Sequence, residues 1–235
     1  MLQILPSDES SVASLLRSSL STSLARGSGP MPRRALIYVP DISVHVFPRG
    51  INRGAIVRDD ADHEHLLRVI INAGRRHGVE INALALMTTH YHLIVTPTWD
   101  GALAKAMQTI GIRHTRFINR KYGRIGTIWN EPYGAALLDD ERYWYTCLRY
   151  VDLNPFRAHL VAAPEASRWS SYRFHALGEP CEWLTPHPLY MQLGATAKAR
   201  QEAYRAMCGV PLTDEELEQQ CHPPRPAILR LPTGA

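Results

Sequence analysis

The spacing of hydrophobic residues along the chain predicts alternating strands and helices. In residues 62–77 the hydrophobic positions repeat at helical spacing, and Gly78 is typical of a helix end. The same test predicts strands over residues 43–48, 81–87, 90–96 and 126–138, the last kinked at Pro132, and helices over residues 103–122 and 140–154, the second ended by Pro155. This order of elements predicts an α+β fold, the ferredoxin-like split βαβ sheet with an added C-terminal helix.

Composition divides the chain into a main domain and three flanking segments. Residues 1–30 are rich in Ser and end in Gly-Ser-Gly-Pro, so we expect a disordered leader, or a wrongly assigned start with Met31 as the true one. A transit peptide fits less well, because the segment contains acidic residues. Residues 31–175 carry the predicted fold. Residues 176–220 are expected to form a small helical extension, and residues 221–235 a Pro-rich tail.

The composition is that of a folded protein. Of the 235 residues, 45% are hydrophobic and 20% charged, which excludes a wholly disordered or fibrous chain. No stretch approaches the roughly 18 apolar residues of a membrane span, so we expect a soluble, intracellular protein. The four cysteines form no Cys-x-x-Cys pair, which argues against a zinc ribbon or a disulfide framework.

Positive charge is concentrated in one segment, residues 101–130, which contains no acidic residue. Six of the 26 basic residues lie there, which leaves 20 basic against 22 acidic residues elsewhere. These six are Lys105, Arg113, Arg116, Arg120, Lys121 and Arg124. The four arginines among them recur at helical spacing along one stripe, which suits contact with a phosphate backbone. A solvated helix face is the alternative interpretation, but such faces usually mix both signs of charge.

Two histidines mark a candidate metal site. His90 and His92 lie two apart in a predicted strand, so both imidazoles point to the same side and can reach one ligand. The alternative is a pair of structural histidines, one solvated and one hydrogen-bonded in the interior. His63 and His65 have the same spacing at a helix start, where the rings diverge, and we assign no metal to them.

The helix of residues 140–154 brings a phenol and an amide onto one face. Tyr150 and Asn154 are four residues apart there. A tyrosine can act as a covalent nucleophile, but with an ordinary pKa of about 10 it needs a cation or a metal nearby. Combined with the His90 and His92 site, these side chains suit phosphoryl transfer. The alternative is a core aromatic next to an ordinary helix end.

An ordered series of motifs resembles a known family. The motifs are His90-Tyr91-His92-Leu93, Phe117-Ile118-Asn119-Arg120-Lys121-Tyr122-Gly123, Gly126-Thr127-Ile128-Trp129, Arg149-Tyr150-Val151-Asp152-Leu153-Asn154-Pro155-Phe156-Arg157-Ala158 and Trp169-Ser170-Ser171-Tyr172. Together they resemble the HUH single-tyrosine transposases of the insertion-sequence 200-like type, and most of all the branch associated with repetitive extragenic palindromes. The resemblance covers residues 31–172 and extends loosely to residue 216.

This resemblance implies a site and a reaction. His90 and His92 would be metal ligands, Asn154 the third ligand, and Tyr150 the nucleophile, with Mg²⁺ or Mn²⁺ as the divalent metal. The family cuts and rejoins single-stranded DNA beside hairpin repeats through a 5′-phosphotyrosine, without ATP. Residues that match an Arg-Gly-Asn-Arg-like element would contact DNA together with the basic segment; they are Arg49, Asn52 and Arg53. A cytoplasmic, nucleoid-associated monomer is expected rather than a homodimer.

The chain departs from the family at three places. Thr88-Thr89 stands where members often have Pro-Asn, Pro132-Tyr133-Gly134 where they have a basic Arg-Tyr-Lys element, and a Pro-rich tail where longer relatives have a further basic helix. The basic residues missing at the second and third of these places favour an alternative function, a catalytically silent binder of DNA hairpins. A metal hydrolase that does not act on nucleic acid is a third hypothesis, which the basic segment argues against.

Overall fold

The computed structural model describes residues 40–221, apart from the side chains of Glu131, Pro132 and Cys221. Four strands form one antiparallel sheet in the order β2-β3-β1-β4. Their bounds are β1 (Val44–Gly50), β2 (Val79–Leu86), β3 (Tyr91–Pro97) and β4 (Trp129–Leu137). The three long helices are α2 (Asp60–His77), α3 (Ala102–Tyr122) and α4 (Glu141–Arg157). This topology confirms the expected ferredoxin-like fold with an added helix; the expected leader, and the tail beyond residue 221, lie outside the described residues.

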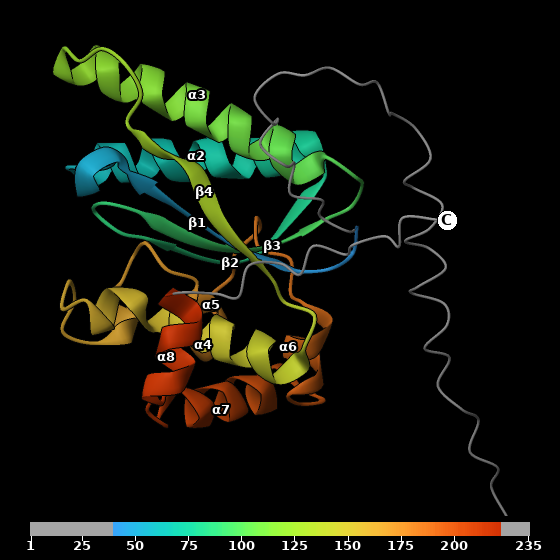
Figure 1. Cartoon of the computed structure of the whole chain (residues 1–235). Coiled ribbons are helices and arrows are strands. Elements are labelled where there is room, and N and C mark those ends of the chain that lie inside the picture. The colour runs from blue at the N-terminus through green and yellow to red at the C-terminus, as the bar shows by residue number, and fades with distance from the viewer. Residues whose placement is uncertain (1–39, 222–235) are drawn as a thin grey trace, which may run out of the picture. The chain divides into compact units, whose positions relative to one another are not determined.

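The helices divide between the two faces of the sheet (Figure 1). Leu93 and Val95 of β3 pack into the hydrophobic core under α2 and α3, whereas Ile94 packs into the core under α4. His45 of β1 pairs with Ile94 across the strands and therefore faces α4 as well. The sheet thus separates α2 and α3 from α4, and the polar residues of the predicted site lie on the α4 side.

Aspartate side chains cap the starts of α2 and α4, and a left-handed glycine ends α2. The Asp59 side chain accepts a hydrogen bond from Asp62 N at the start of α2, and Gly78 takes the left-handed conformation at its end with φ 65°. At the start of α4, Asp140 caps the helix by accepting from Tyr143 N at 2.8 Å. None of the described helices is long and apolar enough to cross a membrane.

Two expected boundaries were wrong. The helix expected to end before Pro155 continues through it to Arg157. Proline removes one N–H from the helix, but the hydrogen bond from Ala158 N to Asn154 O is kept at 2.9 Å, so the last turn still closes. The strand expected from residue 126 begins at Trp129, because Gly126, with φ 86°, belongs to the preceding loop. The expected kink at Pro132 coincides with an irregular register opposite Phe47 and Arg49.

Four short helices follow the sheet. They are α5 (Tyr172–Leu177), α6 (Pro188–Gln192), α7 (Ala197–Cys208) and α8 (Asp214–Cys221). A capping box starts α8, since Glu216 N donates to Thr213 Oγ1 at 3.2 Å and Thr213 N donates to Glu216 Oε2 at 2.9 Å. Tyr204 of α7 and Tyr190 of α6 are buried in the same hydrophobic core as α4.

A buried carboxylate joins α4 to the elements around it. Asp152 is 1% exposed and accepts hydrogen bonds from Tyr204 OH at 2.7 Å, from His175 Nδ1 at 2.8 Å and from Ser171 Oγ. Ser171 in turn accepts from Leu84 N of β2 at 2.9 Å. These bonds connect α4 with α5, α7 and the sheet, and Asp152 lies two residues from Tyr150.

The segment before α5 covers an edge of the sheet. Leu86 N donates to Trp169 O at 2.8 Å, and Ser171 N donates to Leu84 O at 2.9 Å. A single β-bridge pairs Ala85 with Ser170 between these two bonds. The Trp169-Ser170-Ser171-Tyr172 motif is therefore explained by its structure: it pairs with the outer strand β2 and delivers Ser171 to Asp152.

Replacing Asp152 with alanine should lower the free energy of unfolding by about 3–5 kcal/mol, because three buried donors lose their acceptor. Urea denaturation measures the change. Glu202→Ala is the matched control: this carboxylate faces Lys198 at 3.9 Å on the exposed surface of α7, and its loss should cost less than about 0.5 kcal/mol. Equal losses in the two variants would contradict the role given to Asp152.

Candidate functional site

Three histidines lie together on the α4 side of the sheet, two in neighbouring strands and His90 directly before β3. His92 of β3 is 3% exposed, and its Nδ1 lies 2.9 Å from Nε2 of the fully buried His45 on β1. The His90 ring lies 5.0 Å from the His92 ring, centroid to centroid. His90 is also held by Thr89, whose Oγ1 is 3.1 Å from His90 Nδ1. The structure thus brings together the two histidines expected to bind a metal and adds a third.

Burial keeps all three imidazoles neutral. It lowers the pKa of His45 to about 3 and, together with the nearby Arg49, that of His90 to about 4. Burial also lowers the pKa of His92 well below its ordinary value. At neutral pH each ring therefore keeps a lone pair that could bind a metal ion. Among the described residues, His92 Nε2 and His45 Nδ1 are buried atoms without a hydrogen-bond partner.

Tyr150 of α4 packs against these histidines. Its ring is 9% exposed and meets the His92 ring edge to face, with the centroids 5.3 Å apart. The Arg157 guanidinium carbon lies 5.4 Å from the centre of the same Tyr150 ring. Asn154, 8% exposed, follows one turn along the same face of α4. The expected nucleophile Tyr150 therefore lies next to His92 and His45 and next to one cation, Arg157.

The donor set suits a divalent metal only if Asn154 takes part. No group of three or more His, Cys, Asp and Glu side chains that could hold a metal occurs in residues 40–221. Two neutral imidazoles and an amide oxygen would complete a mixed nitrogen and oxygen set, and the unpartnered, buried Nε2 of His92 fits such a ligand. His63 and His65 diverge as expected, since His63 stacks on Trp169 and His65 on Phe117.

The expected DNA-contacting residues fall into two groups. Arg113, Arg116 and Arg120 are exposed on α3, where they line an open pocket of about 280 Å³ together with His65 and Phe117. No ion pair involves these three arginines within the described part of the chain. The same helix carries Lys105, which lies over the Trp99 ring at 4.7 Å, and Arg124 follows its end.

The second group lies near His90. Arg49 is the next-to-last residue of β1 and forms a β-bridge with His90. The exposed Asn52 and Arg53 belong to the short helix η1 (Ile51–Arg53). Backbone bonds connect the two groups: Ile51 N donates to Ile128 O in the segment after α3 at 2.9 Å, and Gly50 N donates to Thr89 O beside His90 at 2.8 Å.

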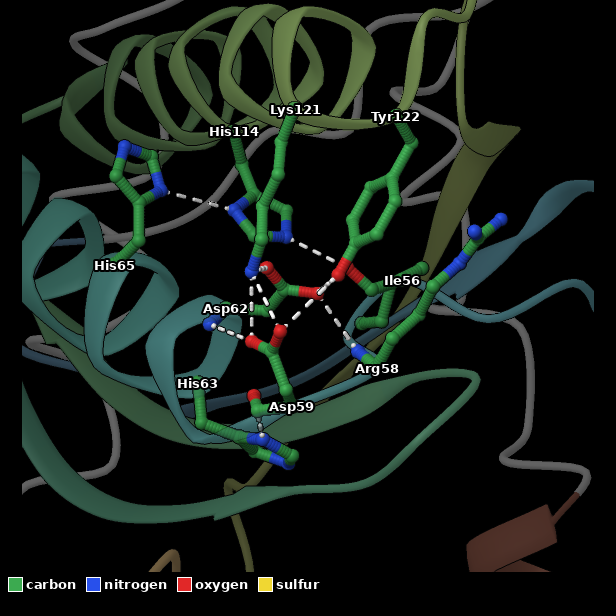
Figure 2. A network of polar contacts seen from close by, with 9 residues as sticks. All are labelled: Ile56, Arg58, Asp59, Asp62, His63, His65, His114, Lys121 and Tyr122. Carbon is green, nitrogen blue, oxygen red and sulfur yellow. Dashed lines mark hydrogen bonds and ion pairs between the residues drawn. The ribbon is translucent and has the colours of Figure 1, made fainter.

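Lys121 differs from the other cations. Figure 2 shows its ammonium between two carboxylates, with Asp59 at 2.7 Å and Asp62 at 2.6 Å. Tyr122 OH donates to the same Asp62 at 2.8 Å. Hydrogen bonds from Lys121 to Asp59 and Asp62 raise the pKa of Lys121. Two carboxylates neutralise its charge where α3 meets the start of α2. Lys121 is therefore less available to bind a phosphate than the three exposed arginines of α3.

Sequence reasoning missed His45 and Arg157. Arg157 lies seven residues after Tyr150, two helical turns on, so the spacing could have placed it on the same face. His45 lacked such a signal, because its contact with His92 depends on the pairing of β1 with β3, which are separated by a helix and a strand.

Comparisons with known proteins agree with the fold. The family model described as "Transposase IS200 like" matches residues 38–154. A REP-associated tyrosine transposase, solved bound to a REP hairpin, aligns with a TM-score of 0.54 and 18% identity over 67% of this chain and 93% of its own. No curated protein matches the chain in sequence.

Two further solved structures align more weakly. A transposase-like protein from Deinococcus radiodurans R1 has a TM-score of 0.37 and 15% identity over 56% of this chain and all of its own. A tRNA(His) guanylyltransferase from Saccharomyces cerevisiae has a TM-score of 0.41 and 11% identity over 77% of this chain and 84% of its own.

The Lys121 network predicts a pH dependence of stability. The hydrogen bond from Lys121 lowers the pKa of Asp59 below its ordinary 3.8, so ionised Asp59 stabilises the fold above that pH, and this stabilisation is lost as pH falls through the lowered pKa. Asp59→Asn keeps a capping side chain but removes the charge. Urea denaturation should find the variant less stable than wild type at pH 7, with a difference that shrinks below pH 4.

The control is Asp60→Asn. Asp60 lies at the same helix start but makes only an exposed pair with Arg168 at 3.1 Å, so its replacement should change stability little at either pH. A pH-independent loss for Asp59→Asn would contradict the ion-pair explanation.

Proposed function

The chain belongs to the family of IS200-like transposases, and from this premise we propose that it is a metal-dependent transesterase that cleaves and rejoins single-stranded DNA next to hairpin repeats through Tyr150. One observation carries the proposal: the Tyr150 ring packs against His92, whose Nε2 is buried without a partner among the described residues. A nucleophile beside an available metal ligand is the arrangement that phosphoryl transfer needs.

Tyr150 would act as the covalent nucleophile. Its oxygen attacks a backbone phosphorus, the bond from phosphorus to the 3′ oxygen breaks, and a 5′-phosphotyrosine and a free 3′-OH result. The phenol gives up one proton and the leaving 3′ oxygen takes one up, so the step is balanced. Attack by a 3′-OH on the phosphotyrosine reverses it. The phosphotyrosine retains the energy of the broken bond, so rejoining needs no ATP.

Three side chains would hold the metal. His90, His92 and Asn154 are the proposed ligands of Mg²⁺ or Mn²⁺, which when bound supplies a Lewis acid for the scissile phosphate. The neutral state of the buried histidines supports this assignment, because protonated imidazoles cannot bind a metal.

Arg157 would assist Tyr150. Its guanidinium lies 5.4 Å from the centre of the phenol ring, and Arg157 itself is exposed at the surface. A cation in this place favours the negative charge that develops on the tyrosine oxygen and on the attacked phosphate. Arginine also lies over the ring of Tyr122, but only the Tyr150 ring, among these two, packs against His92, and this combination supports Tyr150 as the nucleophile.

DNA would follow the two groups of cations. The arginines of α3 are suited to grip the hairpin backbone on one face of the sheet, and Arg49, Asn52 and Arg53 to guide the single strand toward His90. The backbone bonds that join Ile51 to Ile128 and Gly50 to Thr89 support a continuous path between the groups. Action as a monomer, in the cytoplasm and close to the nucleoid, completes the proposal.

Tyr150→Phe should abolish the covalent adduct. Purified protein is incubated with Mn²⁺ and end-labelled single-stranded oligonucleotides from hairpin repeats flanking its own gene, and a denaturing gel detects label that migrates with the protein. Wild type should give an adduct and Tyr150→Phe none, because phenylalanine has no nucleophilic oxygen.

Tyr145→Phe is the matched control on the same helix. Its hydroxyl donates to Leu189 O at 2.8 Å, away from the histidines, so the adduct should persist. Binding to the hairpins without any adduct, with either Mn²⁺ or Mg²⁺, would instead favour the silent DNA binder.

Charge reversal on α3 should weaken binding at any DNA sequence. Each of Arg116→Glu and Arg120→Glu should reduce the slope of log affinity against log salt by about 1, since each removes one phosphate contact. Fluorescence anisotropy with a labelled hairpin measures the slope. Lys198→Glu is the control: the Lys198 side chain, in α7, is 85% exposed and lies outside the proposed path, and the substitution makes the same change of net charge. An equal effect of all three variants would place the hairpin elsewhere.

A further inference from the structure

The hydrogen bond between His45 and His92 constrains the positions of the two rings and also the positions of their N–H protons. His45 Nε2 and His92 Nδ1 are 2.9 Å apart, and neither residue is more than 3% exposed. The remaining nitrogen of each ring, His45 Nδ1 and His92 Nε2, is buried without a partner in the described part of the chain. All four nitrogens are therefore shielded from water, and their protons must be arranged between the two rings alone.

Only two arrangements of protons are possible for two neutral rings. A neutral imidazole carries one proton, and the bond between the rings contains one hydrogen. Either His92 Nδ1 donates to His45 Nε2, which leaves a lone pair on His92 Nε2, or His45 Nε2 donates to His92 Nδ1, which leaves a proton on His92 Nε2. A metal ion can bind His92 Nε2 only in the first arrangement.

We propose that His45 is a positioning residue, which accepts the Nδ1 proton of His92 and thereby keeps the Nε2 lone pair of His92 available to a divalent ion. This inference rests on the proposed function. Metal-bound histidines usually donate their second N–H to a carboxylate, a backbone carbonyl or water. Here an imidazole from the neighbouring strand takes that place.

The surroundings of His45 support an acceptor role. His45 is fully buried, which disfavours a charged ring, and a neutral ring retains the lone pair that an imidazolium lacks. Phe47 contacts both rings, with centroids 5.0 Å from His45 and 6.2 Å from His92, and limits how far either can turn. Val44 and Val46, on either side of His45, are fully buried in the core on the opposite face, which fixes the strand that carries it.

A neutral acceptor has a chemical consequence for the site. A carboxylate at this position would add a negative charge beside the metal and offset part of the ion's charge. An imidazole orients His92 without doing so, and the full charge of the ion remains for the anionic phosphate. His45 thus suits a metal whose task is to hold a phosphodiester.

The tautomer of His92 is measurable without metal or DNA. Long-range ¹H–¹⁵N correlation spectra of the ¹⁵N-labelled, metal-free protein distinguish a protonated from an unprotonated ring nitrogen. The proposal expects the proton of His92 on Nδ1 in wild type. A proton on Nε2 of His92 would overturn it directly, whatever the variants do.

Two variants then separate hydrogen bonding from packing. His45→Leu removes the acceptor, and should release His92 from the Nδ1–H tautomer and weaken Mn²⁺ binding, measured by titration calorimetry without DNA, by about 10–100-fold. His45→Gln offers an amide oxygen as acceptor and should restore both the tautomer and most of the affinity. Ser43→Ala, which removes a buried bond to Thr96 at 3.0 Å, is the control and should leave both readouts unchanged.

The outcomes distinguish this inference from the proposed function. If wild type binds Mn²⁺ and His45→Leu binds it equally well, His45 has no positioning role and the proposed function stands. If wild type binds no Mn²⁺, the metal site fails and the inference fails with it. A loss in His45→Leu that His45→Gln does not restore, or that Ser43→Ala shares, would assign the effect to packing and overturn the proposal.

Discussion

The hydrogen bonds to the buried Asp152 carboxylate hold together the part of the molecule on which the chemistry depends. A carboxylate that leaves water must find donors for its oxygens, and here they come from α5 and its N-cap, through His175 and Ser171, and from α7, through Tyr204. Because Ser171 also bonds to β2, the carboxylate fixes the distance between α4 and the sheet. Tyr150 lies two residues away on α4, so its approach to the histidines is set by a polar anchor as well as by hydrophobic packing.

The candidate site combines residues whose geometry comes from different levels of structure. Tyr150 and Arg157 share a helix face, which local spacing determines. His92 and His45 meet because two strands that are distant in sequence pair in one register. The contact between Tyr150 and His92 depends on the layering of α4 against the sheet (Figure 1). A change in the helix face, in the strand register or in the packing of α4 on the sheet would separate the Tyr150 phenol from the imidazoles.

This hierarchy explains what the sequence could predict. Hydrophobic periodicity and caps were enough for the strand and helix order, and so for the ferredoxin-like topology. Pro155 was misjudged because a proline near a helix end removes only one bond, while the buried face of α4 favours continuation. His45, and the neutralisation of Lys121 by Asp59 and Asp62, could not be predicted, since both arise from pairs about 50 or more residues apart. Charge counted along a sequence does not distinguish a cation that faces solvent from one that faces a carboxylate.

The free backbone groups of the two outer strands, β2 and β4, decide whether a strand of another chain can pair with this sheet. Along β2, the residues around Ser170 already occupy backbone groups that a foreign strand would need. Along β4, Pro132 has no N–H to offer and lies where the register with β1 is irregular. Neither border therefore presents an unbroken ladder for strand addition. The proline in β4 thus leaves this edge of the sheet with one backbone donor fewer, which disfavours edge-to-edge aggregation.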